Sequence, residues 1–159
     1  MICVHDQFLT SEEKQAIEQA CSSYLRAVPS WLGTFKFRPY YKNSYVNHPS
    51  LGPIAKRLST LVPAQKFNTA FLQRYDTGSC VSPHRDPRNN IGFTIIAVAG
   101  EFTGAETTLS CPPGRLHLKS GDVLVMLCTI DGIQGPRHEV SPVITGTRTT
   151  LILNTLEAP

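Results

Sequence analysis

Three kinds of feature are missing from this sequence of 159 residues. No apolar run approaches the roughly 20 residues of a membrane-spanning helix, so we expect no membrane partner. The N-terminal residues lack the basic and apolar regions of a secretory signal. The five cysteines are scattered singly and form no Cys-x-x-Cys pair, which favours free thiols in a reducing compartment over a disulfide framework or a zinc site. We therefore expect a cytoplasmic protein whose thiols are free.

Acidic residues are missing from one long internal segment. Between Glu18 and Asp76 there is none, whereas basic side chains occur throughout it, interleaved with aromatic residues such as Trp31, Phe35 and Tyr45. Lysine and arginine neutralise phosphates, and aromatic rings stack on unpaired bases. Residues 26–74 are thus a candidate contact for nucleic acid. The alternative is that the aromatics pack beneath the fold and the basic residues are solvated.

The length fits a single domain spanning residues 1–159. Within it, residues 1–66 are predicted to be helical and loop support. Ser11, Glu12 and Glu13 are typical of a helix start, and the apolar spacing after them predicts a helix to about Arg26. Residues 31–48 are expected to be extended chain and loop. A second, short helix is expected over 50–61, where Pro63 ends it.

From residue 67 the pattern changes to short runs of β-forming residues separated by turns. Strands are predicted over 69–75, 93–99, 106–109, 115–119, 123–128, 138–143 and 148–154. Regularly spaced short strands favour a β-sandwich or barrel. The sequence therefore predicts a mainly β (α+β) fold, with residues 67–159 as its core and the N-terminal helices packed against it.

The segment Ser82–Pro87 contains a histidine and an aspartate two residues apart. Side chains alternate along a strand, so His84 and Asp86 lie on one face, where a single metal ion can contact both. Two ligands do not make a site. A third candidate is His138, and ten residues after it comes Arg148. Two histidines and one carboxylate form the facial triad of non-haem Fe(II) enzymes.

Arg148 adds a second kind of chemistry. A planar guanidinium pairs with both oxygens of a carboxylate, so it suits the far end of a dicarboxylate co-substrate. Thr150 lies two residues on, on the same face of the predicted strand, and offers a hydroxyl donor.

In this order, His84-x-Asp86, His138 and Arg148 resemble the 2-oxoglutarate- and Fe(II)-dependent dioxygenases. Further segments are similar to prolyl-hydroxylase-like and AlkB-like members of that superfamily. One departure is that Gly104-Ala105-Glu106-Thr107 stands where many members have Gly-Gly-Glu-Thr. The other similar segments are Phe8–Glu13, Arg74–Gly78, Leu118–Asp122 and His138–Arg148.

The resemblance implies a double-stranded β-helix, or jelly roll, and an oxidoreductase that uses 2-oxoglutarate and O2, with ascorbate in support. It implies hydroxylation of a substrate with release of succinate and CO2. The implied ligands of Fe(II) are His84, Asp86 and His138. The implied contacts of the 2-oxoglutarate C5 carboxylate are Arg148, Thr150 and Tyr75.

The substrate is open between two classes. Residues 84–90 and 100–104 resemble the branch that oxidises thymine and methylcytosine (the ten-eleven-translocation and base J hydroxylase group), and this favours a nucleobase or nucleic-acid oxygenase. In that interpretation the substrate contacts are Arg85, Arg88 and Asn89. The N-terminal half instead resembles prolyl-hydroxylase-like members, so prolyl or other amino-acid or peptidyl hydroxylation is the alternative. A further alternative is a non-catalytic metal-binding jelly-roll module, which would have no need of Arg148.

Overall fold

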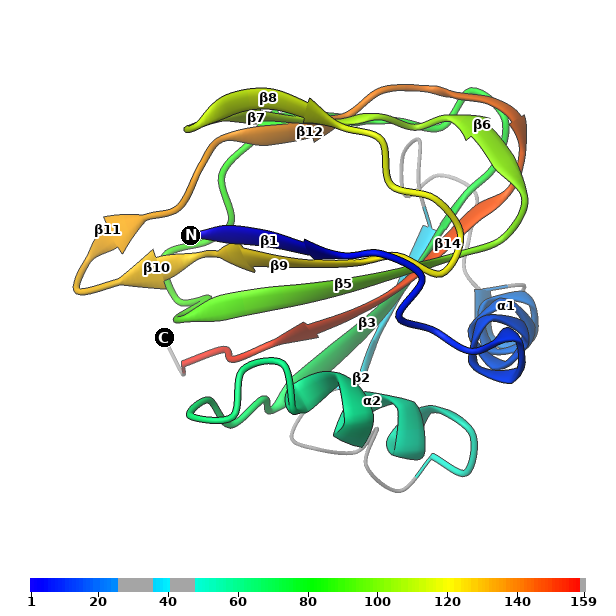
Figure 1. Cartoon of the computed structure of the whole chain (residues 1–159), viewed down its shortest axis with the longest axis horizontal. Coiled ribbons are helices and arrows are strands. Elements are labelled where there is room, and N and C mark those ends of the chain that lie inside the picture. The colour runs from blue at the N-terminus through cyan, green and yellow to red at the C-terminus, as the bar shows by residue number, and fades with distance from the viewer. Residues whose placement is uncertain (26–35, 41–47, 158–159) are drawn as a thin grey trace.

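The computed structural model describes residues 1–25, 36–40 and 48–157, and these form two facing antiparallel sheets (Figure 1). The spatial order of the larger sheet is β1 (Ile2–His5), β9 (Val123–Leu127), β5 (Phe93–Ala99), β14 (Arg148–Asn154), β3 (Thr69–Tyr75) and β2 (Lys36–Tyr40). That of the smaller sheet is β4 (Val81–His84), β12 (His138–Val140), β7 (Thr107–Ser110) and β8 (Pro113–Leu116).

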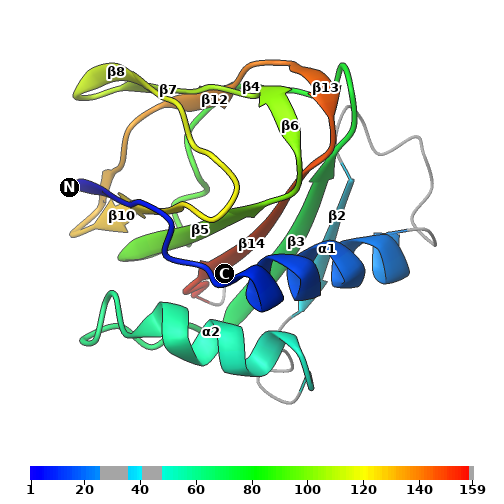
Figure 2. The ribbon, with the colours of Figure 1, turned by 45° about the vertical axis from the view of Figure 1, so that its right-hand side comes forward.

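Two short strand pairs complete the fold. They are β6 (Phe102–Gly104) with β13 (Val143–Gly146), and β10 (Thr129–Ile130) with β11 (Ile133–Gln134). The helices α1 (Ser11–Leu25) and α2 (Leu51–Ser59) lie on the outer face of the larger sheet, away from the smaller one (Figures 1 and 2). The predicted jelly roll with N-terminal helices packed against it is confirmed.

Side chains along the strands of the larger sheet point alternately to the core shared with the helices and to a pocket on the other face. On β14, Leu151 and Leu153 belong to the apolar core shared with the helices, whereas Arg148, Ile152 and Asn154 line a pocket on the opposite face. Strands β3, β5 and β9 alternate in the same way. Because a strand's side chains point alternately to its two faces, one sheet both anchors the helices and forms the wall of a site.

The N-terminal segment contributes more than the predicted helices and loops. Strand β1 was not predicted from the sequence; it pairs with β9 from Ile2 opposite Met126 to His5 opposite Val123. A run of four residues is too short for a periodicity argument, and its pairing with a buried strand decides its conformation. Strand β2 falls within the predicted extended stretch and pairs with β3. The first 66 residues thus supply both edge strands of the larger sheet.

Helix α1 begins with a reciprocal cap. The Glu13 backbone N–H donates to Thr10 Oγ1 over 3.2 Å, and the Thr10 N–H donates to Glu13 Oε2 over 2.9 Å. This capping box satisfies two N–H groups at the helix start. Arg57 of α2 donates to Glu13 Oε1 over 2.8 Å and to the Phe8 carbonyl over 2.7 Å. Glu13 therefore fixes both the start of α1 and its contact with α2.

Glu13→Gln is expected to make the stability depend less on pH. The hydrogen bond from Arg57 lowers the pKa of the Glu13 carboxyl from its ordinary value. A depressed folded-state pKa adds stability above the unfolded pKa, and this is lost as pH falls through the folded value. We expect the variant to lose about 1 kcal/mol of unfolding free energy at pH 7, and the difference to shrink below about pH 4. Urea unfolding across pH measures this; a constant difference would contradict it.

Candidate metal and co-substrate site

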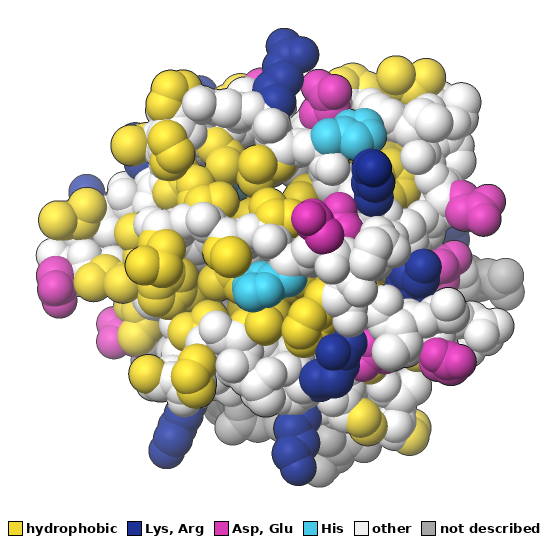
Figure 3. Space-filling model, in the orientation of Figure 1, with side chains coloured by type: hydrophobic (Ala, Val, Ile, Leu, Met, Phe, Trp, Pro, Cys, Tyr) yellow, Lys and Arg dark blue, Asp and Glu magenta, His cyan; other side chains and the backbone are white. Residues whose placement is uncertain are grey.

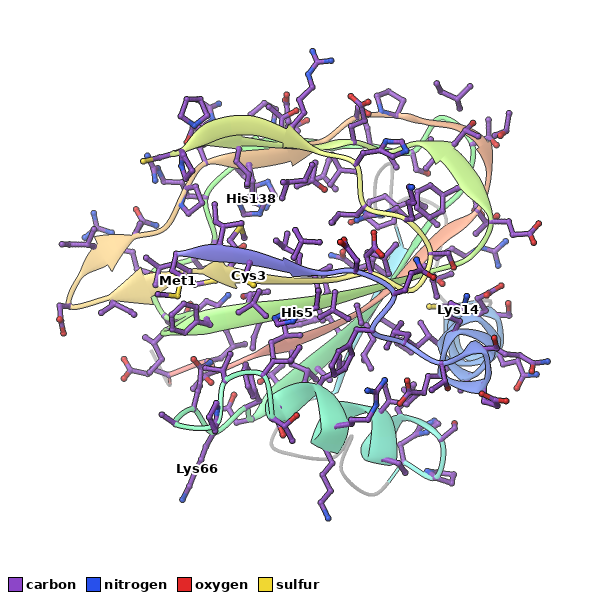
Figure 4. The ribbon with its side chains drawn as sticks, in the orientation of Figure 1. Met1, Cys3, His5, Lys14, Lys66 and His138 are labelled. Carbon is purple, nitrogen blue, oxygen red and sulfur yellow. The ribbon has the colours of Figure 1, made fainter. Side chains whose placement is uncertain are left out.

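Strand register brings the two predicted histidine ligands together. On the antiparallel pair β4 and β12, His84 lies directly opposite His138, and their ring centroids are 4.4 Å apart. Asp86 follows β4 by two residues. Figure 4 shows His138 pointing from β12 into the space between the two sheets.

One oxygen of Asp86 lies near both imidazoles. Asp86 Oδ1 is 3.9 Å from His84 Nε2 and 3.8 Å from His138 Nε2. The three ligand atoms all lie within 4.8 Å of one another. Bonds from nitrogen and oxygen ligands to a transition metal are about 2.0–2.2 Å long, so atoms at this spacing suit one shared ion.

Both rings are held with Nε2 free to bind a metal. His84 Nδ1 is 2.9 Å from the Ser82 carbonyl oxygen, and His138 Nδ1 is 3.1 Å from that of Pro136. A carbonyl oxygen only accepts hydrogen bonds, so in each neutral ring the proton is on Nδ1 and the lone pair is on Nε2. This backbone arrangement orients metal-ligating histidines.

The cluster is open to solvent on one side. The His84 side chain is 42% exposed, compared with 10% for His138. Burial lowers the pKa of His138 from its ordinary value, opposed by the Asp86 charge. The neutral imidazole, which is the form that binds metals, is therefore favoured at neutral pH.

The ligand cluster lies on the wall of a pocket of about 260 Å³ between the two sheets. This volume suits a small co-substrate. Much of the remaining wall is apolar: Ile96, Leu124, Met126, Val140 and Ile152. Such a lining excludes water and strengthens the electrostatic contacts inside.

Arg148 lines the same pocket and is 2% exposed. Its Nε is buried and has no hydrogen-bond partner among the described residues. Burial lowers the pKa of the guanidinium, and the group that opposes this is Tyr75, whose ring centroid is 5.0 Å from Arg148 Cζ. Arginine stays protonated in proteins, so the wall of the pocket includes a buried positive charge.

The side chains around Arg148 form a polar group. Tyr75 lies opposite Arg148 in the strand register, and Gln73 lies opposite Thr150. The Tyr75 hydroxyl donates to Gln73 Oε1 over 2.7 Å, and Thr150 Oγ1 is 3.4 Å from the same oxygen. The three residues predicted for the co-substrate carboxylate therefore lie near one another, but Thr150, unlike Arg148 and Tyr75, is not among the residues that line the pocket. Gln73 was missed, although its position two residues before Tyr75 places both on one strand face.

The residues fit both groups that the resemblance implies. Two histidines and one carboxylate on one side of an ion leave coordination positions open for further ligands. The orphaned Arg148 Nε suits a carboxylate, because a buried donor without a partner costs free energy until an acceptor reaches it.

The side chains predicted to contact the substrate lie outside the pocket wall. Arg85 donates to the Gly135 carbonyl, and Asn89 Nδ2 donates to the Glu157 carbonyl over 3.2 Å. Arg88 is exposed. The asparagine near the metal ligands is Asn90, whose Nδ2 is 3.4 Å from Asp86 Oδ2.

The basic and aromatic segment can be followed only in part. Of residues 26–74, positions 26–35 and 41–47 lie outside the described residues, so Trp31, Phe35 and Tyr45 are not placed. On the face in Figure 3, basic and acidic side chains are interspersed. Within the described part of the chain, no helix is long and apolar enough to cross a membrane.

The fold is that of solved 2-oxoglutarate/Fe(II) oxygenases. No protein-family model and no curated protein matches the sequence. A viral collagen prolyl hydroxylase from Paramecium Bursaria Chlorella virus-1, solved with 2-oxoglutarate, superposes with a TM-score of 0.80 at 14% identity, covering 99% of this chain and 96% of that one.

Two further structures share the fold. A Trichoplax adhaerens prolyl hydroxylase, in complex with a hypoxia inducible factor peptide, gives a TM-score of 0.68 at 14% identity, with 97% and 83% coverage. A Burkholderia pseudomallei oxidoreductase of the 2OG-Fe(II) oxygenase family gives 0.56 at 20% identity, with 76% and 65% coverage. By fold, the chain is similar to oxygenases of this kind, with prolyl hydroxylases among them.

Proposed function

We propose that this protein is a 2-oxoglutarate- and Fe(II)-dependent oxygenase that hydroxylates a peptidyl substrate, most directly a prolyl residue. The observation that carries the oxygenase class is a juxtaposition within one pocket. A cluster of three metal-ligand atoms lines it together with a buried arginine whose Nε has no partner in the described part of the chain. A non-catalytic metal-binding module would have no need of that arginine.

Each residue has a distinct task in this proposal. His84 and His138 would hold Fe(II) through Nε2, and Asp86 through Oδ1. Arg148 would bind the far carboxylate of 2-oxoglutarate, helped by Tyr75. Thr150, which does not line the pocket, would act through its contact with Gln73. When bound, these groups supply the oxidising chemistry, in which one atom of O2 enters the substrate and the other enters succinate as CO2 leaves.

A peptidyl substrate is supported by the comparisons and by the shape of the site. The structural neighbours include a collagen prolyl hydroxylase and a prolyl hydroxylase bound to a peptide. In this chain the pocket is small, and the ligand cluster is exposed on the His84 side. A polymer that stays outside and presents one side chain to the cluster fits this arrangement.

The nucleobase interpretation gains no such support. Its predicted contacts Arg85, Arg88 and Asn89 do not line the pocket. The structural neighbours described above include no nucleic-acid enzyme. Peptidyl hydroxylation is therefore the better supported of the two classes.

A direct assay tests the proposal. The purified protein receives Fe(II), ascorbate and 2-oxoglutarate in air, with either proline-rich peptides or oligonucleotides. We expect succinate formation stimulated by peptide, and a mass gain of one oxygen atom on a prolyl residue. His84→Ala should abolish both, whereas His117→Ala, at a surface position 64% exposed, should retain them.

Each contrary result removes a defined part of the proposal. If oligonucleotides gained oxygen and no peptide did, the peptidyl substrate would be wrong, but the assignment as an oxygenase would stand. Equal succinate from the wild type and His84→Ala would refute the oxygenase assignment itself.

A further inference from the structure

Behind the metal-ligand cluster lies a group of four buried polar side chains, here called the Asp86 support group. Its members are 2–8% exposed. They come from β5, from the residue after β9, from the end of β14 and from the turn after Asp86. The support group consists of Asn90, Thr94, Cys128 and Asn154.

The support group reaches the metal-ligand cluster through one carboxylate oxygen. Cys128 Sγ is 2.9 Å from Asp86 Oδ2, and Asn90 Nδ2 is 3.4 Å from it. The other oxygen, Oδ1, is the one that lies 3.8–3.9 Å from the two histidine Nε2 atoms. The carboxylate therefore presents one oxygen to the metal side and one to the support group.

Donor and acceptor types narrow where the protons of the support group lie; the Asn90 amide also donates within the group, with its Nδ2 3.1–3.3 Å from Thr94, Cys128 and Asn154. Asn154 Oδ1 can only accept, and it is 2.5 Å from Thr94 Oγ1, so it takes the single hydroxyl proton of Thr94. Thr94 then has no proton for Cys128 Sγ, which is 2.8 Å away, but its oxygen can still accept one. The thiol proton of Cys128 therefore has two acceptors within reach, Thr94 Oγ1 and, at 2.9 Å, Asp86 Oδ2. A carboxylate oxygen is the stronger acceptor of the two, so we take the thiol proton to be directed at Oδ2, where the Asn90 amide lies at the longer distance of 3.4 Å.

We propose that Cys128 is a positioning residue for the metal site, whose S–H donates to Asp86 Oδ2 and so keeps Oδ1 directed at the ion. The inference rests on the proposed function, since it assumes that Asp86 binds metal. Hydrogen bonds to a ligating carboxylate orient it before the metal arrives. Without the thiol, Asp86 would keep only the longer Asn90 contact on that oxygen and could rotate away from the histidines.

The test compares substitutions that keep or remove the donor. Cys128→Ser keeps a hydroxyl donor, whereas Cys128→Ala removes it. The matched control is Cys21→Ala, which makes the same change at another fully buried cysteine, whose Sγ contacts the Gln73 carbonyl at 3.7 Å. Co(II) affinity is measured by its visible spectrum, and thermal unfolding of the metal-free proteins shows that each is folded at the assay temperature.

We expect Cys128→Ala to weaken Co(II) binding by about 10–100-fold, the usual effect of losing a group that supports a ligand. Cys128→Ser should bind within a few-fold of the wild type, and Cys21→Ala should match it. A purely structural role would lower the unfolding temperature without changing the affinity of the folded protein. If Cys128→Ala does not fold, Cys128→Val, which fills the space without a donor, replaces it.

Two outcomes would overturn the inference while the proposed function stands. One is wild-type affinity in the folded variant that lacks a donor. The other is an equal loss in Cys128→Ser and in the variant without a donor, which would assign the effect to packing. Failure of the wild type to bind Co(II) or Fe(II) would instead refute the proposed function.

Discussion

Replacing Arg148 by methionine is expected to weaken 2-oxoglutarate binding by at least about 100-fold. When a guanidinium binds a carboxylate through two charge-assisted hydrogen bonds, each bond contributes about 1.5–3 kcal/mol of binding free energy. A difference of about 1.4 kcal/mol corresponds to a tenfold change in affinity. Calorimetric titration with the metal-loaded protein under anaerobic conditions measures the change. Arg148→Lys keeps the charge without the planar guanidinium, so its affinity for 2-oxoglutarate should lie between those of the wild type and Arg148→Met.

The same substitution should leave the metal-free protein as stable as the wild type or more stable. Arg148 is 2% exposed, and residues 1–25, 36–40 and 48–157 offer its Nε no hydrogen-bond partner. Burying a charge without an acidic partner costs free energy. Methionine fills similar space without that cost. Thermal unfolding measures this, with Arg115→Met as a control, because that side chain is 77% exposed.

A ligand that lacks the far carboxylate tests whether Arg148 binds that group. 2-Oxopentanoate keeps the keto-acid end of 2-oxoglutarate but lacks the far carboxylate. If Arg148 binds that carboxylate, the wild type and Arg148→Met should bind 2-oxopentanoate with equal, weak affinity. A loss of the same size for both ligands would show that Arg148 acts elsewhere in the pocket.

The sequence was most informative where function restricts residue type. His84, Asp86, His138 and Arg148 were singled out by their chemistry and order, and the structure brings all four to one pocket. Their three-dimensional arrangement depends on strand register, which the sequence does not state. That His84 lies opposite His138 follows from the pairing of β4 with β12 across 54 positions.

The supporting residues were harder to find. Cys128 ends a run of apolar residues and has the appearance of a core position; its contact with Asp86 spans 42 positions of the chain. Asn89 rather than Asn90 was named because the resemblance implied an asparagine a few residues after His-x-Asp, and both positions meet that description. The Asn90 N–H donates to the Pro87 carbonyl over 2.9 Å, and this turn directs Asn90 rather than Asn89 toward Asp86. Local geometry of this kind is set by tertiary contacts.

His138→Ala is expected to abolish metal-dependent turnover. The imidazole is 10% exposed, its Nδ1 is held by the Pro136 carbonyl and its Nε2 lies 3.8 Å from Asp86 Oδ1. Loss of a residue that supports a metal ligand weakens metal binding by up to about 100-fold. Removing one of the three ligands themselves should weaken Fe(II) or Co(II) binding by more than that. Metal titration and succinate formation without substrate measure this. His117→Ala, at the exposed histidine beside Glu106, is the control.

Together, His138→Ala and Arg148→Met separate the two halves of the pocket. Arg148→Met should bind metal like the wild type, since the guanidinium is no part of the ligand cluster. His138→Ala should lose the metal. It should keep the wild type's weak, metal-independent affinity for 2-oxoglutarate, because the contact between the 2-oxoglutarate carboxylate and Arg148 is untouched. If each substitution abolished both kinds of binding in folded protein, the division of labour between His138 and Arg148 would be wrong. If His138→Ala loses metal binding and Arg148→Met loses 2-oxoglutarate binding, the two results together would show that the pocket holds two separate sites, both of which the reaction needs.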